Sequence, residues 1–385
     1  MTNGSPMNIL FINSTQNWGG GETWLMQISD GLQRRGHHIV IACRRDSDLH
    51  RRLQTSAFTG LPLGGWGDFS PRTIVKIWRI IKRYKIDIIC SNMEKELRLA
   101  GIAAQLAGVP IIPSREVDVP IKSTRINRFF YGRVASGLLV NSYATLNTLL
   151  SSAPWLEQQR RYVVWKGIDP ELFKPVASTS LRDRFHFSPS DCLIGFVGRL
   201  DEQKGIPTLL EAMRIVVRDV PGARLVLAGE GNLRNHIVDF TRRHGLEEHI
   251  FLAGFCSDVP GFLNEIAFLV MPSYWEGFGY AAVEAMAAHK AVIGTNVSSL
   301  PEIIDDGTTG ILVTPRSAEH LAGAIVKLAS ETRLRAEMGA AGAAKVRSTF
   351  SLLTMIEKTE TAFRETIRLH ADGRGAEMRG HVGNQ

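Results

Sequence analysis

The chain has 385 residues, of which 44% are apolar, and a formal net charge of +7 at pH 7. This length exceeds what one ordinary hydrophobic core fills and suits a globular protein of two domains. No run of eighteen apolar residues predicts a membrane-spanning helix, and no secretory leader opens the sequence, so we expect a cytoplasmic protein. The four cysteines lack metal-ligand or redox spacing, which favours a reducing compartment and predicts no zinc site.

The positive charge belongs to the first half of the chain. Residues 1–170 hold 22 Lys and Arg against 12 Asp and Glu, so the remainder holds 23 against 26, and the net +7 divides into +10 and −3. The excess gathers on aromatic-rich segments, "TIVKIWRIIKRYK" and "STRINRFFYGR". Solvated surface charge is one interpretation, and attraction to an anionic surface such as the inner face of a membrane is the other.

The first half alternates apolar strands with helical stretches. It opens with the strand "NILFIN", the glycine-rich turn "NWGGGE", a helix through "TWLMQISDGLQRRG" and a second strand "HHIVIAC". Further strands are expected at "IDIICS", "VPIIPS" and "GLLVNS", and helices at "LRLAGIAAQLAG" and "TRINRFFYGRVA". This alternation is typical of a parallel sheet covered on both faces, so we expect a doubly wound domain over residues 7–168.

A proline-rich polar segment at residues 166–180, "KGIDPELFKPVASTS", predicts the domain boundary. Strands such as "CLIGFVG", "RLVLAG" and "FLVMPS" then restart the alternation and predict a second doubly wound domain over 176–350. We expect an amphipathic helix over about 351–371 to cross back to the first domain, and residues 372–385 to form a disordered tail. The predicted fold is α/β, with two Rossmann-like domains facing each other across a cleft.

Two cations and two glutamates stand out in the second half. Arg199 and Lys204 lie between a strand and a helix expected near Pro207, where the two cations and the positive helix end suit a diphosphate. In "MPSYWEGFGYAAVEAMAA", Glu276 precedes a helix and Glu284 lies in its second turn, with free backbone amides between them. A carboxylate accepts two hydroxyl hydrogen bonds, so Glu284 suits the vicinal diol of a ribose. The alternative for each is a solvated loop or helix charge.

Several of these segments together resemble a known enzyme family. "GRLDEQKGIPTLLEA", "LAGEGNLR", "MPSYWEGFGYAAVEAMAAHKAVIGTNVSSLPEIIDDGTTGILVTP" and "GIDPELFKP" resemble the retaining glycosyltransferases of family 4, which have the GT-B fold. The resemblance is dense over about residues 163–350 and looser in the first half, where "GGGE" is similar to the family's glycine loop. It implies transfer of a sugar from a nucleotide-diphosphate sugar, bound by the second domain, to a glycan or lipid-linked acceptor on the first. Cell-envelope polysaccharide or lipopolysaccharide synthesis would be the setting.

The resemblance also implies roles for individual residues. Arg199 and Lys204 match the family's cations that grip the donor diphosphate, and Glu276 matches a carboxylate close to the donor sugar, so these three are the candidate catalytic residues. Glu284 matches the glutamate that holds the ribose hydroxyls. The implied donor-binding residues are Gly20, Gly21, Gly198, Glu230, Gly277, Phe278, Gly279, Tyr280 and Glu284.

One loop departs from the family pattern. Many members carry a histidine after the strand that here reads "VPIIPS", and this chain continues with Arg115, Glu116 and Asp118 after Ser114. Loops at the carboxyl ends of parallel strands are where function concentrates, although a solvated loop is the alternative. The candidate contacts to the acceptor or the donor sugar are therefore Glu22, Arg115, Glu116 and Asp118.

The mechanism that the resemblance implies is same-face attack, in which the leaving diphosphate accepts the acceptor's proton. The protein would then supply charge stabilisation, and we expect no metal and no cofactor besides the nucleotide-sugar substrate. The basic first domain makes an anionic membrane surface a candidate partner. Three other classes stay open: a nucleotide-sugar epimerase, a non-catalytic nucleotide-sugar-binding protein, and a nucleic-acid-binding protein, for which the sequence has no recognised module.

Overall fold

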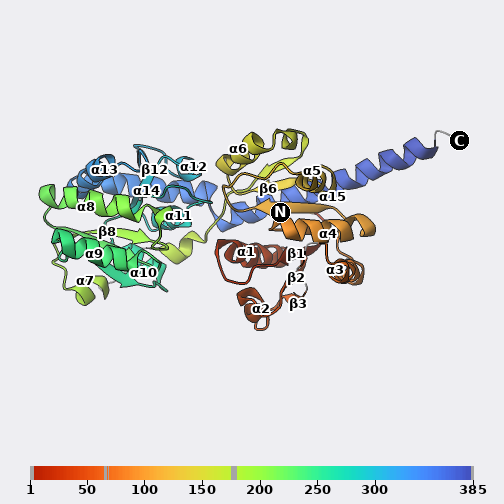
Figure 1. Ribbon diagram of the computed structural model, residues 1–385, viewed down its shortest axis with the longest axis horizontal. Coiled ribbons are helices and arrows are strands. Elements are labelled where there is room, and N and C mark those ends of the chain that lie inside the picture. The colour runs from red at the N-terminus through yellow and green to blue at the C-terminus, as the bar shows by residue number, and fades with distance from the viewer. Residues whose placement is uncertain (1–3, 65–66, 68, 175–179, 383–385) are drawn as a thin grey trace. The chain divides into compact units, whose positions relative to one another are not determined.

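Two compact units make up the chain in the computed structural model, which describes residues 4–64, 67, 69–174 and 180–382. Unit 1 comprises Met1–Trp165 and Leu352–Gln385, and unit 2 comprises Lys166–Ser351. Each unit is a parallel sheet with helices on both faces, which confirms the predicted fold class (Figure 1). Part of the predicted boundary segment, residues 175–179, lies outside the described residues.

The sheet of unit 1 has seven strands in the order β3-β2-β1-β4-β5-β6-β7, and all its pairs are parallel. The strands are β1 Asn8–Asn13, β2 His38–Arg44, β3 Thr59–Leu63, β4 Ile88–Ser91, β5 Ile111–Arg115, β6 Leu138–Val140 and β7 Arg161–Val163. The helices are α1 Gly20–Arg34, α2 Asp48–Leu53, α3 Pro71–Arg83, α4 Glu94–Ala107, α5 Arg125–Phe129, the π-helix η1 Phe130–Val134, α6 Tyr143–Ser152, the 3-10 helix η2 Pro154–Gln158 and α15 Leu352–Val382.

Strand β1 shows why both faces of this sheet are covered. Successive side chains on a strand point to opposite faces. Leu10 and Ile12 enter a hydrophobic cluster with α3 and α4, whereas Ile9 and Phe11 enter another with α1 and α15. Because every residue of β1 after Asn8 is buried, its sequence is a continuous apolar run, as parallel sheets require.

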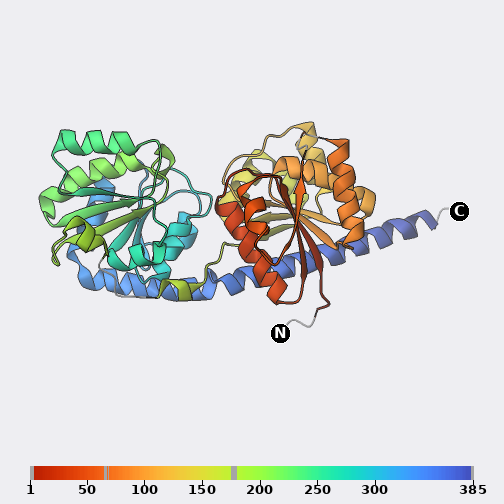
Figure 2. The same ribbon diagram turned by 90° about the horizontal axis from the view of Figure 1, so that it is seen from below.

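Helix α15 packs beside α1 on the second face of the sheet in unit 1 (Figure 2). A side-chain carbon added to Gly31 of α1 would lie 2.1 Å from Ile356 Cδ1, so the glycine allows the two helices to approach closely. The phenyl rings of Phe11 and Phe363 lie 6.1 Å apart. At the helix edge, the buried Glu360 carboxylate accepts a 2.6 Å hydrogen bond from Arg35. The return of the last helix to the first unit was predicted from the sequence.

The sheet of unit 2 has six strands in the order β10-β9-β8-β11-β12-β13, and its pairs are likewise parallel. The strands are β8 Cys192–Val197, β9 Ala223–Ala228, β10 Ile250–Gly254, β11 Phe268–Met271, β12 Ala291–Thr295 and β13 Gly310–Val313. The helices are η3 Pro170–Phe173, α7 Ser180–Phe185, η4 Glu202–Lys204, α8 Ile206–Asp219, α9 Arg234–His244, α10 Val259–Glu265, α11 Tyr280–Ala287, α12 Leu300–Ile303, α13 Ala318–Ser330 and α14 Thr332–Thr349.

The structure differs from the sequence prediction at the end of the chain. Residues 372–382, expected to begin a disordered tail, continue α15 to Val382, so that part of the prediction is wrong. Residues 376–379, Ala-Glu-Met-Arg, lie between the glycines at 375 and 380 and are strong helix formers. Residues 383–385 lie outside the described residues.

Candidate functional site

Lys204 and Glu276 meet at the carboxyl edge of the sheet in unit 2. Lys204 ends η4 in the connection after β8, and Glu276 lies in the connection between β11 and α11. The Lys204 ammonium donates to both carboxylate oxygens of Glu276, at 2.7 and 2.9 Å. Strand order reverses between β8 and β11, and ligands of open parallel sheets bind at the carboxyl ends of strands at such a switch point.

Glu276 accepts hydrogen bonds from two side chains of its own unit. Besides Lys204, the Ser273 hydroxyl donates to Glu276 Oε1 at 2.6 Å, and the side chains of Lys204 and Glu276 are only 19% and 5% exposed. A buried carboxylate needs such partners because its desolvation is costly. Glu276 therefore holds the Lys204 ammonium at this edge, a role that the sequence did not predict.

Arg199 lies in the same connection and is far more exposed. Its guanidinium pairs with Asp201 at 2.9 Å and donates to the Gln203 side chain at 2.8 Å. Gln203 in turn donates through its side chain to the Trp275 carbonyl at 3.1 Å. The connection after β8 is thus tied to the connection after β11, and Arg199 keeps an exposed positive group beside the Lys204–Glu276 pair.

Glycines allow these two connections to pack closely. Gly205 has a φ of +69°, and a side-chain carbon there would lie 1.9 Å from the carbonyl oxygen of Pro272. A carbon added to Gly229, after β9, would lie 1.8 Å from the Gly198 carbonyl oxygen. No other residue type fits such contacts without moving the backbone. Gly198 was predicted as a site residue, and its neighbours Gly205 and Gly229 were not.

Glu284 presents a carboxylate without an internal partner. It lies in α11 and is half-buried, and burial raises its pKa to about 7. The carboxylate makes neither an ion pair nor a hydrogen bond with any residue that the structure describes. Burial raises the pKa of the Cys256 thiol, after β10, and the nearby charges of Asp258 and Glu284 add smaller contributions. A poorly solvated carboxylate without a donor is costly, and such groups are concentrated at functional sites.

The glycine-rich segment between Glu276 and Glu284, predicted to have free backbone amides, leads directly into α11. Gly279 is the N-terminal cap of the helix, with a φ of +92°, and Tyr280 is its first residue. Phe278 is buried, and its ring packs against those of Tyr280 and Phe350. The Phe278 side chain therefore belongs to the core, and its carbonyl accepts a hydrogen bond from the Ser299 hydroxyl at 2.7 Å. The contact of the Gly277–Gly279 backbone to a ligand stays a prediction. Glu230, after β9, is exposed and lies beside Gly254.

In unit 1 the glycine loop follows β1, which also lies at a reversal of strand order, between β2 and β4. Helix α1 begins at Gly20, and a side-chain carbon on Gly21 would lie 2.9 Å from the Asn92 side-chain nitrogen after β4. Glu22 is buried and accepts hydrogen bonds from Asn13, at 2.7 Å, and from Thr15. These contacts give Glu22 a local structural role; its predicted contact to a substrate stays a prediction.

A second buried glutamate, Glu96, was not predicted. Its carboxylate accepts from the backbone amides of Ser14, Asn92 and Met93 at 2.5, 2.7 and 2.9 Å, and burial raises its pKa to about 7. It therefore joins the connection after β1 to the connection after β4. The sequence signal was its place in the first turn of α4, where a glutamate can bond back to the helix cap.

The candidate residues at the end of β5 and in the loop after it differ in their hydrogen-bond partners. Arg115 is buried, donates to the Val119 carbonyl at 3.1 Å and lies 3.6 Å from the Glu94 carboxylate. Glu116 accepts a hydrogen bond from the Ser114 hydroxyl. Asp118 Oδ1 is buried and has no hydrogen-bond partner among the described residues, and the same holds for the single atoms Arg115 Nε and Glu116 Oε2, although both of those residues have other partners. Buried polar atoms are nearly always satisfied. Among the described residues of this loop, Asp118 is the carboxylate that accepts no hydrogen bond through either oxygen.

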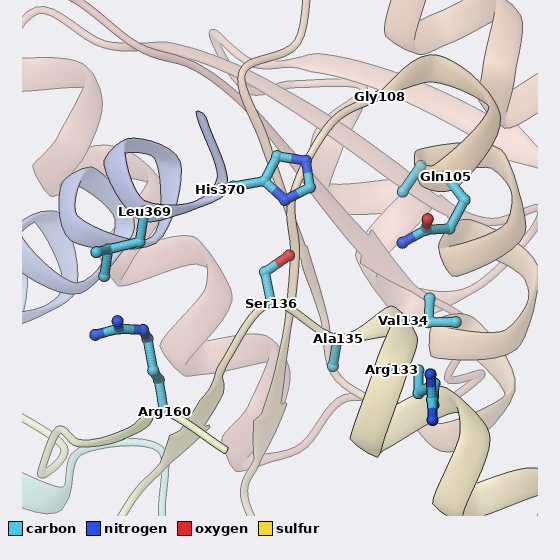
Figure 3. Close-up of a pocket in the computed structure, with 10 residues that line it drawn as sticks. Gln105, Gly108, Arg133, Val134, Ala135, Ser136, Arg160, Leu369 and His370 are labelled. Carbon is cyan, nitrogen blue, oxygen red and sulfur yellow. The ribbon is translucent and has the colours of Figure 1, made fainter. Parts of the chain in front are cut away.

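A separate hollow of about 450 Å³ lies at the opposite edge of the sheet in unit 1, where strands β5, β6 and β7 begin (Figure 3). Gly108, Ser136 and Arg160, which line it, each precede one of these strands. None of the residues predicted as site residues lines this hollow. Among the described residues, no group of three His, Cys, Asp or Glu is placed to hold a metal ion, and a metal-free reaction stays a prediction.

Two family models together match most of the chain. Residues 18–172 match the model described as Glycosyltransferase Family 4, and residues 179–345 match the one described as Glycosyl transferases group 1. The chain belongs to the glycosyltransferases. The first match ends and the second begins close to the boundary between the two units after Trp165, so each match lies mainly within one unit.

Known proteins agree with this assignment. The D-inositol 3-phosphate glycosyltransferase of Segniliparus rotundus is 30% identical over 262 residues, 64% of this chain and 56% of the relative. The UDP-Gal:alpha-D-GlcNAc-diphosphoundecaprenol alpha-1,3-galactosyltransferase of Escherichia coli is 21% identical over 309 residues, 77% of this chain and 80% of the relative. This glycosyltransferase spans about half the length of the first curated relatives it matches.

A solved structure supports the fold. HepE of Anabaena, in complex with UDP, superposes with a TM-score of 0.83 and 22% sequence identity, covering 93% of this chain and 100% of HepE. The GT-B fold implied by the sequence is thereby confirmed for this glycosyltransferase. In the part of the chain that the structure describes, no helix is both long and apolar enough to span a bilayer.

Proposed function

We propose that this glycosyltransferase moves a sugar, with retention of configuration, from a nucleotide-diphosphate sugar to a glycan or lipid-linked acceptor in cell-envelope polysaccharide or lipopolysaccharide synthesis. The observation that supports it most is the arrangement in unit 2. A cation held by Glu276 lies at the switch point of the sheet, and the next helix carries the partnerless carboxylate of Glu284. A diphosphate needs the first feature and a ribose diol uses the second.

Lys204 and Arg199 are the proposed ligands of the donor diphosphate. Lys204 has three N–H donors, and Glu276 and a phosphate oxygen can share them, so the glutamate keeps the ammonium charged and oriented. Arg199 is exposed, and its guanidinium would give up its contact to Asp201 or Gln203 and donate to a second phosphate oxygen instead. Backbone amides at Gly277–Gly279 add donors at the positive end of α11. Charge that grows on the leaving diphosphate would then be stabilised without a metal, by several kcal/mol in a dry site.

Glu284 is proposed to accept hydrogen bonds from both ribose hydroxyls. The ribose would supply the donors that the structure does not offer to this carboxylate. Gly198 and Glu230, on the neighbouring connections after β8 and β9, are proposed to line the remaining part of the donor site. Gly20 and Gly21 of unit 1 stay predicted contacts of the donor phosphates.

The acceptor is proposed to bind unit 1, with Asp118 as the first candidate contact because its Oδ1 lacks a donor. The Escherichia coli relative acts on a diphosphoundecaprenol-linked sugar, which makes a lipid-linked glycan the first acceptor to test. The Anabaena neighbour binds UDP, which makes UDP-sugars the first donors to test. The four cysteines are free thiols, in keeping with the proposed reaction at the inner, reducing side of the membrane.

The test is incubation with a panel of nucleotide-sugars, with and without lipid-linked acceptors, in buffer containing a metal chelator. Transfer predicts that free nucleoside diphosphate appears only when both substrates are present, and NMR of the product reports the anomeric configuration. A new sugar epimer formed without an acceptor would show an epimerase instead. Tight donor binding without turnover across the panel would indicate a binding protein.

A further inference from the structure

Unit 1 exposes apolar side chains in an unusual setting. Phe69, Val75, Trp78, Ile126 and Phe129 are between 37% and 53% exposed. Val75 and Trp78 lie three residues apart on one flank of α3, whereas Ile126 and Phe129 belong to α5. Single exposed apolar residues are normal in proteins, but a cluster of them marks an interaction surface.

Ring contacts join the two helices into one surface. The Phe69 ring, just before α3, lies 5.9 Å from that of Phe130, which lies 5.4 Å from that of Phe129. Phe130 is buried and so bridges two exposed rings. We call the surface made by α3, α5 and the residues just before them the α3–α5 surface.

The charge of this surface has one sign. Helix α3 carries five Lys or Arg, α5 carries two and η1 carries one, and none of the three carries an Asp or Glu. A hollow of about 680 Å³ beside α3 is lined by Arg72, Lys76 and Arg79 together with Ser70 and Val75. This hollow could hold an anionic headgroup between three cations and a hydroxyl.

The α3–α5 surface lies beside the carboxyl edge of the sheet in unit 1. Helix α3 follows β3 and α5 follows β5, so both begin at the carboxyl edge of the parallel sheet. Gly21 and Asp118, which follow β1 and β5, lie at this same edge. A flat anionic partner on the α3–α5 surface would therefore lie next to the edge proposed to receive the acceptor.

We propose that the α3–α5 surface docks this glycosyltransferase onto a bilayer of anionic phospholipid, with its exposed rings in the headgroup layer and its cations on lipid phosphates. Basic helices with aromatic and aliphatic residues exposed among the cations bind at such interfaces. A nucleic acid would use the cations and could stack on the rings, but it gives Val75 and Ile126 no apolar environment. This inference rests on the proposed function, because a lipid-linked acceptor lies in a membrane and the protein must reach it there.

Co-sedimentation tests the proposal on the full chain without donor or acceptor, so its outcome is independent of transferase activity. Vesicles of phosphatidylcholine alone are compared with vesicles that also contain phosphatidylglycerol. We expect the protein to pellet with the anionic vesicles, to remain in the supernatant with the neutral ones, and to be released by salt. Equal partition onto both vesicles, or onto neither, would overturn the proposal. Binding to a DNA duplex without binding to anionic vesicles would assign the surface to nucleic acid instead.

Two pairs of variants locate the contact. Lys76→Glu/Arg79→Glu should weaken vesicle binding by roughly tenfold or more, because each Lys or Arg near an anionic membrane surface strengthens binding and each new Glu opposes it. The matched control, Arg242→Glu/Arg243→Glu, reverses two exposed charges on α9 of unit 2 and should change binding much less. Phe129→Ser should weaken binding severalfold, and Leu172→Ser, at an exposed position of unit 2, should not. Equal losses in test and control variants would show that the α3–α5 surface is not the contact.

Trp78 offers a spectroscopic test. Its indole should move into the headgroup layer, so tryptophan emission should shift to shorter wavelength when anionic vesicles are added. The Trp78→Phe variant should still bind and should show a smaller shift. An unchanged shift in this variant would place Trp78 outside the contact and would overturn the proposed orientation.

Discussion

The ammonium of Lys204 donates to both carboxylate oxygens of Glu276 across 72 residues of sequence. The pair stands between neighbouring strands β8 and β11, and its glutamate is further held by Ser273. The cation is therefore fixed before a ligand arrives, which would limit the ordering cost of binding the proposed diphosphate. Lys204 and Glu276 are each other's ionic partners, so substituting one leaves the other charge without that partner.

Substitutions at Lys204 and Glu276 should separate the effect on donor turnover from the effect on stability. In Lys204→Met, donor turnover should fall by roughly tenfold or more, because a charge-assisted contact is lost. Glu276 would keep only its Ser273 hydrogen bond, and unfolding free energy should fall on the order of 2 kcal/mol. The double variant Lys204→Met/Glu276→Gln should regain stability without regaining turnover. Steady-state kinetics and chemical denaturation measure the two effects.

A matched control exists in the same unit. Lys345 pairs with Asp305 at 2.8 Å, away from the switch point, and Asp305 is half exposed. Lys345→Met should leave donor turnover unchanged. If this variant lost turnover as strongly as Lys204→Met, the assignment of Lys204 to the diphosphate would be wrong.

The carboxylate of Glu284 should make donor binding depend on pH. Its pKa of about 7 in the folded protein lies above its usual value, so it is increasingly ionised as the pH rises through 7. Only the ionised form accepts from both ribose hydroxyls with full strength, so donor affinity should increase over this range. Glu284→Gln should weaken donor binding by roughly tenfold at pH 8 and remove the increase. Isothermal titration at several pH values measures this, with Glu337→Gln on the exposed face of α14 as control.

The same carboxylate should destabilise the fold at high pH. Because the folded protein binds this proton more tightly than the unfolded chain, stability falls as the pH rises from about 4.5 to 7 and stays low above that range. Glu284→Gln should therefore stabilise the protein at pH 8, on the order of 2 kcal/mol, and much less at pH 4.5. A variant less stable than the parent at pH 8 would contradict the absence of a partner for Glu284.

Gly205 should tolerate no side chain. In Gly205→Ala the new carbon would meet the Pro272 carbonyl oxygen, at a backbone conformation unfavourable to alanine, and the cost should exceed about 2 kcal/mol. Because the residue joins the connections that carry Lys204 and Glu276, donor binding should weaken as well. Gly323→Ala, in α13 with open space around it, should instead stabilise by up to about 1 kcal/mol. Thermal unfolding of both variants compares the two positions.

Asp118 should affect the acceptor rather than the donor. Asp118→Ala removes an oxygen that has no internal donor, so stability should be unchanged or slightly higher. If the acceptor supplies the missing donor, the acceptor KM should rise by about tenfold while donor affinity stays the same. An unchanged acceptor KM would remove Asp118 from the site.

The architecture was predictable because strand and helix periodicities alternate along most of the chain. The sequence did not predict β3, since Gly60 and Pro62 interrupt its apolar pattern, and such residues suit an edge strand. It also missed β7, which has three residues and lies at the other edge. Where the segment 124–135 was expected to be one helix, α5 passes into the π-helix η1, which packs against α4.

The candidate site was predictable in composition and less so in its contacts. Arg199, Lys204 and Glu284 were chosen by residue type and by position after a strand. That Lys204 bonds Glu276, and that Ser273 completes the pair, follows from the adjacency of β8 and β11, which no local pattern specifies. The internal partners of Glu22 and the missing partner of Asp118 likewise result from side chains distant in sequence.

The return of α15 to the first sheet makes unit 2 an insertion within unit 1. A fragment ending at residue 165 would lack Ile356 and Phe363, and would expose the groove around Gly31 and Phe11 that they cover. Residues 166–351, in contrast, form one continuous segment that can be expressed separately. Unit 2, which is proposed to bind the donor, can thus be produced by simple truncation, whereas unit 1 requires its two terminal segments to be joined by a designed linker.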